Sequence, residues 1–174
     1  MTSQLKVDRI SPATGSEIII DGFGGGKVLQ YAISAYTAQP STTSVIDTDG
    51  SVPQNSEGIE ILTATITPTS ESSKLLIEFD APFTGGNSGM GNVFALFQDS
   101  VADAIVASSS TIMDSTVANQ AMLRHYMTSG TTSATTFKIR WGVTGGIGYI
   151  NRWDTSAVFG ETGEATLKVM ELAG

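Results

Sequence analysis

The side chains able to carry out acid–base or nucleophilic chemistry are few. The chain has one histidine, His125, and 17 acidic residues, and it has no cysteine, which excludes a thiolate nucleophile and a zinc–thiolate site. A Ser-His-Asp relay needs its histidine beside an activated serine in a cleft, but His125 stands among apolar neighbours and no nucleophile elbow is present. A glycosidase needs two facing carboxylates, and the sequence singles out no pair. We predict a structural histidine and no enzymatic activity.

Two short segments imitate ligand-binding loops. The run from Gly22 to Lys27 has the glycines of a phosphate loop, but Val28 stands where Ser or Thr is needed, and a strand is expected to follow instead of a helix. The run Asp47-Thr48-Asp49-Gly50-Ser51 starts like a calcium loop, but the glutamate expected at the twelfth position is missing. We interpret the first as a linker and the second as an acidic turn, with a lone surface calcium as the alternative. No cofactor is predicted.

One cluster of aromatic and polar residues suits a sugar. Aromatic faces beside amide and guanidinium donors bind glycans by stacking and directed hydrogen bonds, and Tyr149, Asn151, Arg152 and Trp153 supply these groups. Structural packing is the alternative role for the same residues. Trp141 is assigned to the core, because it shares one face of its predicted strand with other apolar residues.

Charge and composition exclude some partners. The net charge is −8, whereas a protein that grips phosphates needs the opposite sign, so we expect no nucleic-acid partner. No secretion signal is readable and no apolar run is long enough to cross a bilayer, so we expect no membrane insertion. Only 15% of residues are charged, and Ser, Thr and Gly are common, as in many external β-proteins. A virion protein made in the host cytoplasm and released by lysis reconciles these observations.

Hydrophobic residues alternate with polar ones along most of the chain, which is the signature of half-buried strands. The clearest case is 137–143, and Leu29, Tyr31, Ile33 and Ala35 form another apolar set, while 93–97 is apolar on both faces, as in a central or interface strand. Residues 117–127 tolerate a helix, but a strand is favoured. We predict strands at 17–21, 28–36, 59–67, 73–81, 91–98, 104–108, 119–128, 135–143, 147–152 and 165–172. Short strands separated by frequent turns indicate an all-β antiparallel sandwich or jelly roll.

The first 26 residues are predicted to be separate from the domain at 27–174. A triple glycine ends this segment, and glycine-rich runs make flexible hinges. The segment also carries regularly placed apolar residues, which a frayed terminus does not need: Leu5, Val7, Ile10, Ile18 and Ile20. We interpret 1–26 as an extended anchoring arm that docks on a neighbour, with a frayed terminus as the alternative.

Several ordered segments resemble one group of proteins. The residues Thr65-Ile66-Thr67-Pro68-Thr69-Ser70, the strand 135–141, the run Tyr149-Ile150-Asn151-Arg152 and the closing Val169-Met170-Glu171-Leu172 together resemble tailed-phage fibre and virion structural proteins. The resemblance implies a structural role and often trimeric assembly, and it carries over no catalytic residue. The chain has no long repeats or collagen-like shaft, which favours a short fibre, knob or decoration subunit.

We therefore expect a non-enzymatic virion protein on the particle surface, bound to other capsid or tail proteins and forming a homo-oligomer, as a trimer. Apolar residues such as Phe94, Leu96 and Tyr36 are expected at the contact between copies, and a host surface glycan is a candidate partner. The alternatives are a carbohydrate-binding adhesin module, which predicts saturable sugar binding lost on Trp153→Ala, and a hydrolase, which predicts glycan turnover.

Overall fold

The computed structural model describes residues 27–115, 117–152 and 162–174. These residues form antiparallel sheets with no helix, so none of their elements is a helix that could cross a membrane. The strands are β1 (Val28–Tyr36), β2 (Ser41–Thr42), β3 (Ile59–Ile66), β4 (Lys74–Gly85), β5 (Gly91–Gln98), β6 (Val106–Thr111), β7 (Asn119–Thr128), β8 (Thr135–Val143), β9 (Gly148–Ile150) and β10 (Ala165–Leu172). The predicted all-β antiparallel class is confirmed.

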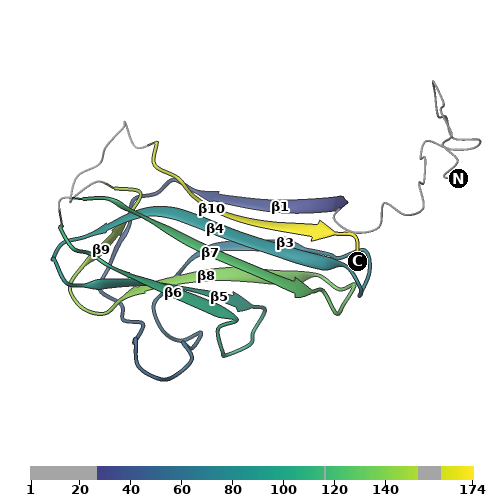
Figure 1. The fold of residues 1–174 in the computed structure, drawn as a ribbon, viewed down its shortest axis with the longest axis horizontal. Coiled ribbons are helices and arrows are strands. Elements are labelled where there is room, and N and C mark those ends of the chain that lie inside the picture. Colours follow the sequence, from purple (N-terminus) through teal and green to yellow (C-terminus); the bar gives the residue numbers. More distant parts are fainter. Residues whose placement is uncertain (1–26, 116, 153–161) are drawn as a thin grey trace, which may run out of the picture.

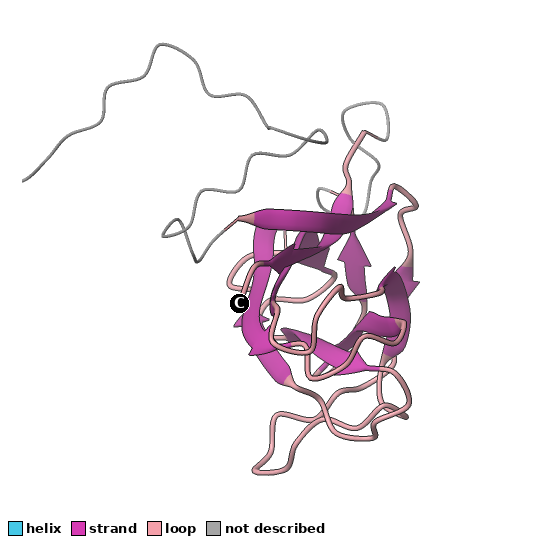
Figure 2. Cartoon of the chain, turned by 90° about the vertical axis from the view of Figure 1, so that its right-hand side faces the viewer, coloured by secondary structure: helices cyan, strands magenta, loops and turns pink. Residues whose placement is uncertain are grey.

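The eight longer strands form a jelly roll. One sheet, here called sheet A, has the order β1-β10-β4-β7, with β9 and β2 continuing beyond the end of β10. The other, sheet B, has the order β3-β8-β5-β6. The pairs β1–β10, β3–β8, β4–β7 and β5–β6 are nested, as when one long hairpin folds over on itself. Figures 1 and 2 show the two sheets facing each other around one interior.

Most strand bounds agree with the predicted ones to within a few residues, and residues 119–128 form a strand as favoured. β4 continues to Gly85 instead of ending near residue 81, because Pro82 still fits the strand and accepts a hydrogen bond of 2.9 Å from the backbone N–H of Asn151. β6 lies a few residues later than predicted, and the two-residue β2 was not predicted. The strand predicted at 17–21 lies outside the described residues.

The interior is built from the inward residues of both sheets. Along β8, Phe137, Ile139 and Trp141 are fully buried between half-buried neighbours, which confirms the predicted alternation and the core position of Trp141. The ring of Phe94 lies parallel to Trp141, at 9° and 6.4 Å between centroids, and close to Phe79 at 5.4 Å. These aromatic contacts between strands of both sheets hold the sandwich together.

A buried hydrogen bond anchors the tryptophan. Its Nε1 donates to Oδ1 of Asn92 at 2.8 Å, and neither residue has measurable solvent exposure. The indole N–H and the amide oxygen therefore satisfy each other inside the sandwich.

The expected contact residues Phe94 and Leu96 are wrong as an interface between copies, because both are buried within the single chain, and Tyr36 is a half-buried residue packed against the same core. β5 carries apolar residues on both faces because it is a central strand that is covered on each side. The inward face gives Phe94 and Leu96 to the core, whereas the outward Val93, Ala95 and Phe97 are buried outside it.

The loop that joins β2 to β3 covers the outward face of β5. Its backbone continues the edge of β8, because Ser44 accepts from the N–H of Val143 at 2.9 Å. Ile46 is fully buried, and the guanidinium of Arg140 donates to the carbonyls of Glu57 at 2.7 Å and Gly58 at 2.8 Å. In Figure 1 this loop runs below β5 and β6. The outward residues of β5, a central strand of sheet B, are thus buried within the single chain.

In β1 the more apolar face points to solvent and the more polar face points toward the core. Leu29, Tyr31 and Ile33 are exposed, and the half-buried residues are Gln30, Ala32, Ser34 and Tyr36. A register irregularity between Val28 and Gln30 accompanies this arrangement. The predicted apolar set of Leu29, Tyr31, Ile33 and Ala35 therefore lies on the outer face of sheet A and not in the core.

A buried carboxylate links three segments of the chain. Glu171 on β10 accepts hydrogen bonds from Nε2 of Gln30 at 2.6 Å and from the backbone N–H and hydroxyl of Thr69, both at 2.7 Å. Burial raises the pKa of Glu171, but hydrogen bonds from Ser73, Gln30 and Thr69 together outweigh it and lower the pKa to about 2. Glu171 therefore stays ionised and ties β1, β10 and the β3–β4 loop together.

Candidate interaction surface

Four apolar side chains form a line across the outer face of sheet A. The register places Tyr31 of β1 beside Met170 of β10, Met170 beside Leu76 of β4, and Leu76 beside Tyr126 of β7. All four point outward, because they alternate with the core-facing residues of their strands. Tyr31 is 66% exposed and Tyr126 is 58% exposed, with the half-buried Met170 and Leu76 between them. We call this line the apolar row.

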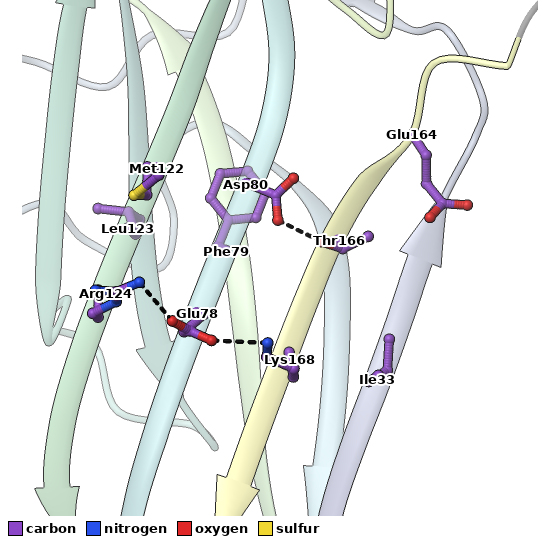
Figure 3. Close-up of a pocket in the computed structure, with 10 residues that line it drawn as sticks. All are labelled: Ile33, Glu78, Phe79, Asp80, Met122, Leu123, Arg124, Glu164, Thr166 and Lys168. Atoms are coloured by element: carbon purple, nitrogen blue, oxygen red, sulfur yellow. Dashed lines mark hydrogen bonds and ion pairs between the residues drawn. The ribbon is translucent and has the colours of Figure 1, made fainter.

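A second line of residues runs beside the apolar row and carries charges. It places Ile33 next to Lys168, Lys168 next to Glu78, and Glu78 next to Arg124. Figure 3 shows Glu78 between the two cations: its carboxylate is 2.9 Å from Nζ of Lys168 and 2.8 Å from the guanidinium of Arg124. The three charges join β10, β4 and β7 across the sheet.

Next to this charged line the face has a depression of about 430 Å³. Met122 and Arg124 of β7 lie on one side of it, and Thr166 of β10 and Glu164, which directly precedes β10, lie on the other (Figure 3). The hydroxyl of Thr166 donates to the carboxylate of Asp80 at 2.6 Å. The depression is thus lined by both polar and apolar groups.

The charges on this face cancel. The cations on its outward positions are Lys74, Arg124 and Lys168, and the anions at the same face or lining its depression are Glu78, Asp80 and Glu164. Among the described residues, three positive and three negative charges give this face no net charge, although the whole chain carries −8. The face is therefore neutral on a strongly acidic protein.

The chemistry available here is binding by contact. The hydrogen bond from Lys168 lowers the pKa of Glu78; burial opposes that effect and Arg124 adds to it. Glu78 is thus ionised at neutral pH, which suits an ion pair and not a general acid. His125 lies on the other, core-facing side of β7 and is half-buried. In the described parts of the chain, no three His, Asp or Glu residues are placed to hold a metal ion.

The predicted glycan residues are only partly available. Asn151 is buried, with a left-handed φ of 58°, and its Nδ2 donates to the carbonyls of Tyr36 at 2.7 Å and Ala38 at 2.9 Å. Its amide therefore holds a loop and does not face a ligand. Arg152 lies over the half-buried ring of Tyr149, at 5.3 Å from the centroid, and donates to the carbonyl of Gln39 at 2.5 Å. Trp153 lies outside the described residues, so glycan contact stays a prediction.

The remaining predicted sites are the anchoring arm and the acidic turn. The anchoring residues Leu5, Val7, Ile10, Ile18 and Ile20 all lie outside the described residues. The acidic turn is present: Oδ1 of Asp49 accepts from the N–H of Ser51 at 2.7 Å and from its hydroxyl at 2.6 Å, and these bonds lower the pKa of Asp49.

Sequence reasoning missed the apolar row as a unit. Its members lie far apart in the sequence, and only the pairing of β1, β10, β4 and β7 brings them together. One signal was present, because Leu76 and Met170 are apolar at positions that alternate with the core residues of their strands.

Comparisons with known proteins find similar solved structures of low sequence identity. No protein-family model matches it, and no curated protein does. Similar solved structures include dimeric latent PorU from Porphyromonas gingivalis, with 11% identity, a TM-score of 0.41, and coverage of 87% of this chain and 14% of that one. A structure of the infectious bursal disease virus Gt strain is also similar, with 10% sequence identity and a TM-score of 0.39. The match covers 99% of this chain and 45% of that one. A structure of the VP2 subviral particle of that virus shows 10% sequence identity to this chain and a TM-score of 0.34. The match covers 97% of this chain and 44% of that one.

The chain spans less than half the length of each of these three proteins. Likeness at this level carries no conclusion about what the chain binds or assembles with.

Proposed function

We propose that this chain is a non-enzymatic structural subunit on the surface of a tailed-phage particle, a short fibre, knob or decoration protein that assembles with copies of itself as a trimer. The sequence resemblance described above supports the phage assignment. The observation that supports assembly is the apolar row: Tyr31 and Tyr126 are both more than half exposed at the ends of one continuous line across sheet A. Contiguous exposed apolar surface marks contact sites in soluble proteins.

The contrast between the two sheets strengthens this argument. The outward apolar residues of β5 on sheet B, Val93, Ala95 and Phe97, are buried within the single chain, and the loop that joins β2 to β3 lies beside Val93 and Phe97. Nothing in the described part of the chain covers sheet A in the same way. A surface left open on one sheet and closed on the other is expected where a protein partner supplies the cover.

The mechanism is attachment without a chemical step. Several copies on one particle bind a host surface together, so weak individual contacts add up through effective concentration. The arm at residues 1–26 supplies the anchor to other capsid or tail proteins in this proposal, and the β-domain faces outward.

The test is to find the chain on the particle. Purified phage particles carrying an epitope-tagged version of the full chain are imaged with a gold-labelled antibody, and their subunits are counted by mass spectrometry. We expect a fixed number of copies at one defined position on the particle. Recovery of the chain only as free protein in the lysate, with turnover of a glycan substrate, would contradict the proposal.

A deletion separates the anchoring role from the rest. A chain lacking residues 1–26 is expected to be absent from particles while the full chain is incorporated beside it. Incorporation of the shortened chain at the same copy number would show that the arm is not the anchor, and would leave the virion assignment in place.

A further inference from the structure

We infer that copies of this chain meet through the outer face of sheet A, with the apolar row at the centre of the contact. The inference rests on the proposed self-assembly and names its surface. It replaces the earlier expectation for Phe94 and Leu96, which lie in the core.

The first argument is where the exposed apolar side chains gather. Tyr31 and Ile33 of β1 and Met122 and Tyr126 of β7 are the most exposed large apolar residues on any described strand, and all four point outward from sheet A. Apart from Val28 and Leu29 at the start of β1, the remaining exposed large apolar side chains of the described residues lie in turns and loops, as at Val101. Leu76 and Met170 fill the gap between the two edge strands, so the exposed aromatic rings belong to one continuous strip.

The second argument identifies the partner as another copy of the same chain. Identical chains that carry −8 each repel one another, and contact costs least through a face without net charge. The described residues place three cations and three anions on this face, so copies can approach through it without net charge repulsion. A strongly basic partner would favour an acidic surface instead, and the acidic excess of this protein lies elsewhere.

The third argument concerns the size of the contact. Four strands about 4.8 Å apart, each with about eight residues at about 3.3 Å, cover roughly 500 Å². A stable interface buries about 800 Å² on each partner. A flat pair using only this face would fall short, whereas in a closed ring each copy contacts two neighbours and adds its sheet edges to the buried area. We therefore expect a ring, in agreement with the proposed trimer.

The main test measures the mass of the full chain in solution. Sedimentation velocity over nanomolar to micromolar concentrations is applied to the unmodified chain and to Tyr31→Glu and Tyr126→Glu. Both tyrosines are more than half exposed in the single chain, so their replacement leaves the fold intact, which the circular dichroism spectrum checks. We expect a trimer for the unmodified chain, and for each variant an increase of about a hundredfold in the concentration needed for assembly.

The matched control is Val101→Glu. Val101 is 54% exposed but lies in the turn between β5 and β6, away from sheet A, so this variant should assemble like the unmodified chain. Loss of assembly in the control together with the two tyrosine variants would overturn the inference, because a general effect of added charge would then explain the result. Normal assembly of both tyrosine variants would overturn it as well.

A second measurement tests the same contact surface while the assembly stays intact. Because the chain has no cysteine, Met122→Cys and Val101→Cys each introduce a single thiol. At concentrations where the mass is that of the assembly, a maleimide should modify the thiol at position 122 at least tenfold more slowly than the one at 101. Dilution to the monomer should remove this difference. Equal rates in the assembled state would show that the copies meet elsewhere.

The outcomes separate this inference from the proposed function. A dimer that both tyrosine variants dissociate would support the surface and contradict the trimer. A monomer at all concentrations would overturn the surface, while the imaging of labelled particles would still decide whether the chain is a virion subunit.

Discussion

Gln30 and Glu171 are joined by a hydrogen bond of 2.6 Å, although 141 positions separate them in the sequence. Their contact connects β1 to β10, which are the first and last strands of the jelly roll. Glu171 is fully buried and ionised, with Thr69 and Ser73 as its other donors. This carboxylate is therefore the point at which acid should act on the fold.

We predict that the chain loses stability as the pH falls from 4.5 toward 2. The pKa of Glu171 is lowered from 4.5 to about 2 in the folded chain. The folded state thus binds this proton less readily than the unfolded state, so the stabilisation is complete above pH 4.5 and disappears as the pH falls to 2. Urea unfolding at a series of pH values measures this loss.

The variant Glu171→Gln removes the charge and should weaken the fold at pH 7 by about 2 kcal/mol, since a buried charged acceptor is lost. Its stability should also vary less between pH 4.5 and 2. The control is Glu60→Gln, because Glu60 is an exposed residue whose ion pair with Lys138 is long, at 4.0 Å. An unchanged pH profile in Glu171→Gln would contradict the assignment.

Gly142 should not tolerate a side chain. A Cβ atom at this position would lie 2.5 Å from Cγ1 of Ile46 and 2.7 Å from its backbone nitrogen. The loop that covers sheet B would have to move away, so Gly142→Ala should destabilise the fold by about 2 kcal/mol or more. Gly50→Ala is the control, because nothing lies within 4 Å of a Cβ atom there. Equal unfolding midpoints for the two variants would contradict the predicted close packing.

Trp141→Phe should destabilise the fold by about 3 kcal/mol, because it leaves a small cavity and removes the donor to Oδ1 of Asn92. Part of this loss should disappear when Asn92 is already replaced by Ala, since the hydrogen bond is then absent in both chains. A double-mutant cycle measured by urea unfolding gives the coupling. Strictly additive losses would show that the bond does not contribute.

Asn151→Ala should lower stability and not sugar binding. The substitution removes one hydrogen bond to the end of β1 and one to the loop after it, and it places alanine at a left-handed φ of 58°, which together should cost about 2 kcal/mol. Asn151→Gly keeps the backbone conformation and should lose less. Tyr149→Ala should instead weaken binding on a glycan array, if the predicted glycan contact is made there. Weaker sugar binding with unchanged stability in Asn151→Ala would contradict this division.

Much of the fold was predictable, because alternation along one strand reports burial directly. In β8 the large residues Phe137, Ile139 and Trp141 all face inward between charged neighbours, so both the strand and its buried face could be predicted. In β1 both faces are mostly uncharged, and the apolar set proved to be the outer one. Alternation shows that a strand has two different faces, but the neighbouring strand decides which of them is buried.

The candidate surface was harder to predict, because it depends on pairing between distant segments. Tyr31 and Tyr126 lie 95 positions apart in the sequence (126 − 31 = 95), and only the order of the strands puts them at the ends of one row. The burial of Val93, Ala95 and Phe97 likewise depends on a loop whose path no local pattern indicates. The buried, ionised state of Glu171 likewise depends on Gln30, Thr69 and Ser73, which only the fold brings to it.

The pairing of β1 with β10 also sets where the domain begins and ends in space. The N–H of Ala173 donates to the carbonyl of Lys27 at 2.9 Å, so the two ends of the domain are in direct contact at one pole (Figure 1). Joining them with a few linking residues and opening the chain at a turn, such as the one at Gly130, would give a circularly permuted protein with the same strand neighbours. Because the two ends of the domain are in contact, the same strand packing is compatible with a chain that starts at one of several other turns.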